Sequence, residues 1–119
     1  MSLPANYDFD YYIGDTKEFV VAPMSSGNQT YDLTGFTGAF VISNEKSPNP
    51  EWSVDGVIEL NAMEGTVYCA IFPSVGLQLN QGTPYFYDVE IRKTVSGKEY
   101  VYTLLRGTIT PVMGVNKSV

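Results

Sequence analysis

The stretch Tyr85-Phe86-Tyr87-Asp88-Val89-Glu90-Ile91-Arg92 shows the clearest periodicity in the chain. Apolar and aromatic side chains occupy every second position, and charged residues occupy the positions between them, with Phe86 as the one large apolar exception. A repeat of two residues is typical of a β-strand that buries one face. We therefore predict a strand over residues 85–92 whose inward face consists of Tyr85, Tyr87, Val89 and Ile91.

The same alternation extends to other parts of the chain. After the turn at Ser96-Gly97, the segment from Tyr100 to Ile109 predicts a hairpin partner for this strand. Its expected inward residues are Val101, Leu105 and Ile109. Earlier segments predict three more inward sets, which are Phe36, Gly38, Phe40 and Ile42, then Val67, Cys69 and Ile71, and a shorter pair of Phe19 and Val21.

Turn-forming residues separate these strands at short intervals. Examples are Ser25-Ser26-Gly27-Asn28, Ser47-Pro48-Asn49-Pro50 and Asn80-Gln81-Gly82, and no window has a sustained helical period. Several short strands spaced in this way are typical of an all-β sandwich or barrel. With 119 residues, we expect a single β-sandwich domain over 1–119, with its core at about 8–112 and short flexible termini.

Two glycines mark places where the backbone is constrained. In Asp32-Leu33-Thr34-Gly35 we expect a turn, with Leu33 at the edge of the core and Gly35 at positive φ. Gly107 follows Arg106 inside a predicted strand, which indicates a β-bulge or a close backbone contact.

The composition disfavours several classes of function. Seven Lys and Arg residues against thirteen Asp and Glu residues give a net charge of −6. Nucleic acid and anionic membranes both require basic surfaces, so we expect neither as a partner. The chain has no histidine, the commonest general base and zinc ligand, and we expect no enzyme and no cofactor.

Clusters of carboxylates offer the main chemical alternatives. Asp8, Asp10 and Asp15 lack the spacing of a calcium loop, so a solvated sheet edge is the preferred interpretation and no metal site is predicted. The pairs Glu59/Glu64 and Asp88/Glu90 could act in glycoside hydrolysis, but exposed strand faces carry such pairs routinely. Cys69 lies between inward apolar residues and is expected to pack in the core.

The aromatic residues are the best candidates for binding. Tyrosine is enriched at interface hot spots, and aromatic pairs also stabilise exposed sheet faces, so both roles stay open. Trp52 has two interpretations as well, an anchor for the loop before it or a contact to a neighbouring subunit. Our interface candidates, which we expect on outward faces or rims, are Tyr12, Trp52, Tyr68, Phe72, Phe86, Tyr100 and Tyr102.

Several motifs occur in an order that resembles a known family. They are Tyr12-Ile13-Gly14-Asp15-Thr16, Tyr31-Asp32-Leu33-Thr34-Gly35-Phe36, Gly65-Thr66-Val67, Leu79-Asn80-Gln81-Gly82 before Tyr85, and Leu104-Leu105-Arg106-Gly107-Thr108-Ile109-Thr110. The series resembles the immunoglobulin-like β-sandwich domains of tailed-phage virion proteins, notably the N-terminal domain of baseplate upper proteins. It spans about residues 8–112. The resemblance implies an antiparallel sandwich of about seven to nine strands.

The resemblance also implies a function. We expect a virion structural protein that acts as an assembly or adaptor module in the tail, baseplate or neck, with other phage virion proteins as partners and as a homo-oligomer in the particle. Its first residues, which lack the features of a signal peptide, could serve as an arm that pairs with a neighbour's sheet edge. The expected location is the virion, after synthesis in the host cytoplasm. Alternatives are a capsid decoration protein or a carbohydrate-binding module for host glycans.

Overall fold

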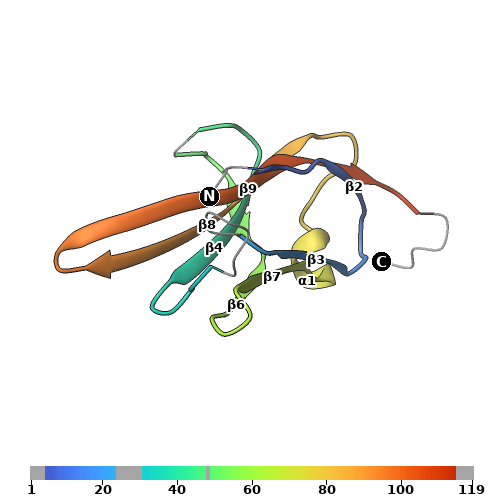
Figure 1. The fold of residues 1–119 in the computed structure, drawn as a ribbon. Helices are drawn as coiled ribbons and strands as arrows, with labels where there is room; N and C mark the ends of the chain where they lie inside the picture. Colours follow the sequence, from blue (N-terminus) through green and yellow to red (C-terminus); the bar gives the residue numbers. More distant parts are fainter. Residues whose placement is uncertain (1–4, 24–30, 48, 115–119) are drawn as a thin grey trace.

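The chain forms an all-β sandwich of two packed sheets (Figure 1). The computed structural model describes residues 5–23, 31–47 and 49–114. Its elements are β1 (Ala5–Asn6), β2 (Phe9–Tyr12), β3 (Lys17–Val21), β4 (Thr37–Ser43), β5 (Ser53–Asp55), β6 (Val57–Asn61), β7 (Thr66–Ile71), α1 (Pro73–Gly76), β8 (Tyr85–Val95) and β9 (Lys98–Val112). In its described ranges, no helix is long and apolar enough to cross a membrane.

The larger sheet has the strand order β1-β9-β8-β4-β5, with β2 also paired to β9, and the smaller sheet has the order β3-β7-β6. All pairs are antiparallel except β1 and β2, which run parallel to β9. The prediction of a wholly antiparallel sandwich is therefore wrong at this edge, because alternation identifies the buried face of a strand but not its direction. Residues 5–6 and 9–12 pair within their own chain, so they are not a free arm; residues 1–4 lie outside the described residues.

Apart from Val101, the predicted inward residues form the core or lie against it. Every member of the set in β8 is at most 4% exposed, and Val67, Cys69 and Ile71 are fully buried. Three rings join the two sheets: Phe19 lies 5.6 Å from Phe40 and 6.2 Å from Tyr87, and Phe40 lies 5.6 Å from Tyr87, between ring centroids.

The predicted turns at Asp32–Gly35 and Ser96-Gly97 are also present, whereas the turn predicted at Ser25-Ser26-Gly27-Asn28, and Pro48 of the predicted turn at 47–50, lie outside the described residues. Leu33 is 1% exposed, Gly35 has φ +83°, and the Thr34 backbone N–H donates to the Asp32 carboxylate over 2.9 Å. Ser96 and Gly97 both have positive φ, as a two-residue type I′ hairpin turn requires. The short helix α1 was not predicted; Pro73 stands in its first turn, where the missing N–H is tolerated.

The inward assignment of Val101 is wrong, because a bulge changes the phase of β9. Val89 pairs with Leu105 and Glu90 pairs with Thr103, so Leu104 is an extra residue in the ladder. In the part of β9 that precedes this bulge, each side chain therefore lies on the side of the sheet opposite to the predicted one, and Val101 is 41% exposed. At Gly107 the alternative of a close backbone contact is confirmed, since an added Cβ would lie 1.9 Å from the Tyr7 carbonyl oxygen.

Candidate interaction surface

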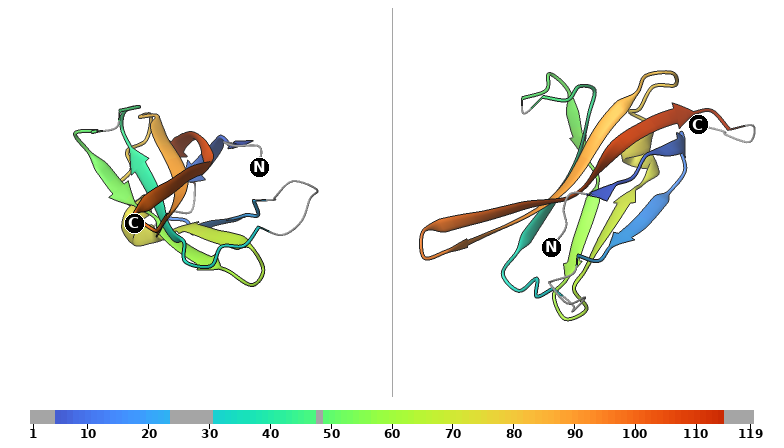
Figure 2. Two further views of the ribbon diagram at one scale, coloured as in Figure 1. Left: turned by 60° about the vertical axis from the view of Figure 1, so that its left-hand side comes forward. Right: turned by 45° about the horizontal axis from the view of Figure 1, so that its top comes forward.

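The hairpin of β8 and β9 extends beyond the rest of the sandwich. The pairing of β8 with β4 ends at Arg92, and the pairing of β9 with β1 begins at Leu105. In the part of the chain that the structure describes, residues 93–95 and 98–100 thus pair only with each other, and residues 101–103 pair only with β8. We call residues 93–103 the ribbon. Figure 2 shows this hairpin pointing away from the other strands.

One side of the ribbon continues the core-facing side of the larger sheet. The smaller sheet does not reach beneath it (Figures 1 and 2), so side chains that would otherwise be buried are open to solvent. We call this side the ribbon face. The pairing register of β8 and β9 places five residues on this side, which are Lys93, Val95, Lys98, Tyr100 and Tyr102.

A groove of about 550 Å³ lies where the ribbon meets the sandwich. Its aromatic rings are tilted: Phe36 lies 6.2 Å from Tyr31 at 57° and 6.2 Å from Tyr102 at 48°. The residues that line it are Tyr31, Asp32, Phe36, Lys93, Val95, Tyr100 and Tyr102. The groove therefore combines a mainly aromatic surface with one cation and one anion.

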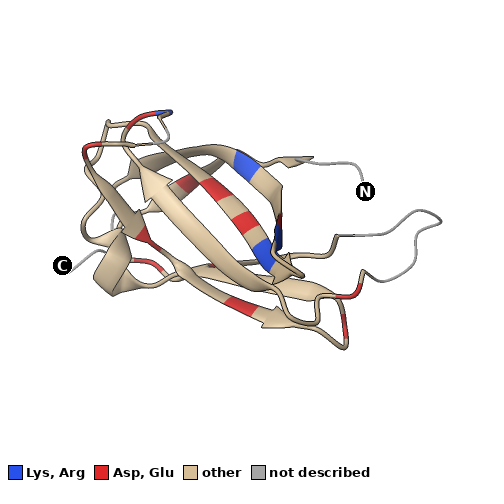
Figure 3. Ribbon diagram, turned by 90° about the vertical axis from the view of Figure 1, so that its left-hand side faces the viewer, with Lys and Arg blue, Asp and Glu red and all other residues tan. Residues whose placement is uncertain are grey.

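Charges on the two sides of the ribbon differ. On the outer side Arg92 forms ion pairs with Glu90 at 2.6 Å and Glu99 at 3.8 Å, and Figure 3 shows acidic and basic positions close together along these strands. On the ribbon face the Lys93 Nζ lies 5.1 Å from the centroid of the Phe36 ring. Hydrogen bonds from Thr34 and the charge of Lys93 lower the pKa of Asp32, so this carboxylate at the groove stays ionised.

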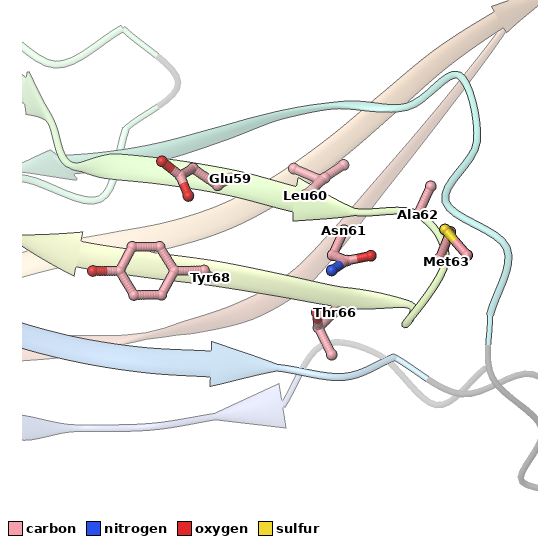
Figure 4. Close-up of a pocket in the computed structure, with 7 residues that line it drawn as sticks. All are labelled: Glu59, Leu60, Asn61, Ala62, Met63, Thr66 and Tyr68. Carbon is pink, nitrogen blue, oxygen red and sulfur yellow. The ribbon is translucent and has the colours of Figure 1, made fainter.

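The outer surface of the smaller sheet has the opposite character. Val20, Tyr68 and Glu59 lie directly across from one another on β3, β7 and β6, and the Tyr68 hydroxyl donates to Glu18 Oε2 over 2.6 Å. We call these four residues the acid face. Glu59 and Tyr68 also line a hollow of about 430 Å³. Figure 4 labels the residues around it, which are Glu59, Leu60, Asn61, Ala62, Met63, Thr66 and Tyr68.

The hydrogen bond to Glu18 is the first cause that raises the pKa of Tyr68 to about 12, with the negative charges of Glu18 and Glu59 adding to it. The ordinary value for tyrosine is about 10. A folded-state pKa above the unfolded one means that this stabilisation is complete below pH 10 and is lost as the pH rises towards 12.

We therefore expect Glu18→Gln to bring the pKa of Tyr68 back towards its ordinary value. The measurement is the alkaline absorbance titration of tyrosine, compared with a Tyr68→Phe variant that identifies the contribution of this one ring. Between pH 10 and 12 the wild type should also lose more stability than Tyr68→Phe does. Identical titrations of wild type and Glu18→Gln would show that the 2.6 Å hydrogen bond does not control this phenol.

The structure brings two of the predicted interface candidates together. Tyr100 and Tyr102 both line the groove, but on the ribbon face and not on the outer side as predicted, because the bulge at Leu104 inverts the alternation. Tyr100 is 43% exposed, and Tyr102 packs partly against the core. Tyr68 lies on the acid face.

The other candidates lie apart from the groove. Tyr12 is exposed at the end of β2, and Phe72 is exposed just before α1. Phe86 is half-buried with Lys46 Nζ 5.2 Å from its ring, and Trp52 packs on Tyr85 with ring centroids 5.5 Å apart. The contact with Tyr85 supports the interpretation of Trp52 as a loop anchor.

Sequence reasoning missed the other five residues of the groove. Asp32 was assigned to a turn and Phe36 to the inward face of its strand, Tyr31 appeared only in a motif, and Lys93 and Val95 were not assigned. One signal for the groove was available in the sequence. Phe36 is the first residue of its inward set, and an inward residue at the end of a strand lies at the edge of the core.

The chemical alternatives receive little support from the described residues. They contain no group of His, Cys, Asp or Glu that could hold a metal ion. Asp88 and Glu90 share the outer side of β8, where burial and the charge of Glu90 raise the pKa of Asp88, and Glu90 is already paired with Arg92. Cys69 is fully buried, which raises the pKa of its thiol to about 12.

No family model and no curated protein sequence matches this chain. The features of the structure that bear on function are its two surfaces, the ribbon face with its groove and the acid face.

Proposed function

We propose that this protein is a phage virion structural protein, an assembly or adaptor module of the tail, baseplate or neck that acts through protein–protein contacts. The ordered motifs that resemble virion sandwich domains support the phage setting. The ribbon is the observation that carries the mechanism: an isolated two-stranded hairpin is only marginally stable in water. Val95 and Tyr100 on it are each 43% exposed, which favours a partner that covers them.

We propose further that the sandwich is immunoglobulin-like. In that fold one sheet contains strands B, E and D, and the other contains G, F, C and C′. The orders β3-β7-β6 and β9-β8-β4-β5 correspond to these two sheets. Many such domains also carry a tyrosine at the start of strand F whose hydroxyl bonds to the backbone a few residues upstream. Tyr85 matches it, since the Asn80 backbone N–H donates to its hydroxyl over 2.9 Å.

The tilt of the groove rings favours a protein partner over a glycan. A flat platform for sugar stacking requires exposed rings that are nearly coplanar, whereas Phe36 is inclined by 57° to Tyr31 and by 48° to Tyr102. Tilted rings interdigitate well with the side chains of a protein surface.

The proposal is tested by mass spectrometry of purified phage particles. We expect the protein in the particles, and we expect the double variant Val95→Ser, Tyr100→Ser to be lost from them although it folds, because both side chains are substantially exposed. The control is Leu77→Ser, which removes a side chain of 48% exposure away from the ribbon. Absence of the wild type from particles, despite its synthesis in infected cells, would refute the proposal.

A further inference from the structure

The ribbon face and the acid face have opposite charges. The ribbon face carries Lys93 and Lys98, and the acid face carries Glu18 and Glu59. Among the described residues, the ion pairs within 4 Å all involve Arg92, on the other side of the ribbon. The two lysines are therefore not engaged in ion pairs of this kind, although Asp32 lies close enough to Lys93 to feel its charge.

No cation neutralises the acid face from its own sheet. In β3, β6 and β7, whose residues are all described, Lys17 is the one Lys or Arg. Its Nζ donates to the Tyr7 hydroxyl over 2.8 Å and lies 4.9 Å from the centroid of Phe9, so it is directed towards the N-terminal strands. The acid face therefore keeps its negative charge.

Both surfaces also expose apolar side chains in amounts typical of contact sites. Val20 on the acid face is 61% exposed, and Met63 beside it in the hollow is 95% exposed. On the ribbon face Val95 and Tyr100 supply the apolar part. Each surface thus combines exposed apolar side chains with charged ones, as protein interfaces do.

The two surfaces of one molecule cannot meet each other. The molecule is elongated, with extents of 48 × 28 × 22 Å, and the ribbon points away from the smaller sheet (Figure 2). The complementary charges can therefore be satisfied only between molecules.

We propose that the ribbon face of one copy docks on the acid face of a second copy, with Lys93 and Lys98 against Glu18 and Glu59. Tyr100 and Val95 then cover Val20 and Tyr68. Because the two contacting surfaces differ, the contact is heterologous and builds a ring when the rotation closes or an open filament when it does not. This inference rests on the proposed function, since it names the partner of the ribbon.

The test uses two charge-reversal variants studied by sedimentation velocity at low salt. One is Lys93→Glu with Lys98→Glu, and the other is Glu18→Lys with Glu59→Lys. We expect the wild type to self-associate, and we expect each variant alone to raise the dissociation constant by about tenfold or more, because like charges then face each other. In an equimolar mixture, the reversed ribbon face of the first variant can meet the reversed acid face of the second. The natural ribbon face of the second variant can meet the natural acid face of the first. Both contacts join opposite charges, so the mixture should restore assembly.

Controls separate these contacts from a general effect of net charge. Lys46→Glu and Glu51→Lys change the charge by the same amount per site, away from both surfaces, and should leave association unchanged. If reversal at Lys93 disturbs the fold, as thermal unfolding would reveal, the single changes Lys98→Glu and Glu59→Lys at exposed positions make the same test.

Several results would overturn the inference. A wild type that stays monomeric up to near-millimolar concentration would mean that the ribbon contacts another protein or a glycan. Association that survives Glu18→Lys with Glu59→Lys would place the contact elsewhere, for example between the free edges of two ribbons. A monomeric protein found in particles refutes this inference alone, whereas a self-associating protein absent from particles refutes only the proposed function.

Discussion

Replacement of Phe40 by alanine is expected to lower the free energy of unfolding by about 3–5 kcal/mol, the range for a large aromatic side chain removed from a core. Phe40 is 1% exposed and comes from the larger sheet, yet its ring contacts Phe19 of the smaller sheet edge to face. It also packs against Tyr87 and against the backbone of Gly56, where an added Cβ would lie 2.4 Å from the ring. Loss of this ring leaves a cavity between the two sheets.

The matched control is Phe86→Ala, which deletes the same atoms from β8, the neighbour of β4 in the larger sheet. Phe86 is half-buried on the opposite side of that sheet, so we expect a loss of about 1 kcal/mol. Urea denaturation followed by circular dichroism measures both values. Equal losses in the two variants would contradict the assignment of Phe40 to the junction of the sheets.

The strands of the sandwich outside the ribbon were predictable from the alternation of apolar and polar residues. Tyr87, Val89 and Ile91 alternate with charged neighbours, and burial of one face requires that pattern. The bulge in β9 was not predictable, because Leu104 and Leu105 are both apolar and either could have been the inward residue. Nothing in the residues of β2 reveals a parallel partner a hundred positions later, since alternation does not encode strand direction.

The candidate site was predictable in part. Tyr100 and Tyr102 were recognised as interface candidates from their residue type, but their side of the strand depended on the unseen bulge. The groove itself depends on where the smaller sheet ends relative to β8 and β9. That difference in length arises from tertiary packing and leaves no periodic signal in Phe36 or Lys93.

Substitution of Gly107 by alanine should cost about 3 kcal/mol, because the new methyl group cannot be accommodated without backbone movement. Its Cβ would lie 1.9 Å from the Tyr7 carbonyl oxygen and 2.7 Å from the carbonyl carbon. The same carbonyl accepts a hydrogen bond of 2.6 Å from the Tyr87 hydroxyl, and the Tyr7 backbone N–H donates to the Arg106 carbonyl oxygen over 2.9 Å. The N-terminal segment must therefore shift away from β9 and lose both contacts.

Two measurements distinguish this steric effect from ordinary glycine strain. Gly82→Ala introduces a Cβ into open space at φ +83°, so its cost is limited to about 1 kcal/mol of backbone strain. Proteolysis should cut Gly107→Ala, but not Gly82→Ala, faster within residues 5–12, since only Gly107 lies beneath that segment. If Gly107→Ala unfolds at the same urea concentration as the wild type and resists proteolysis equally, the parallel strands β1 and β2 do not lie against β9 as described.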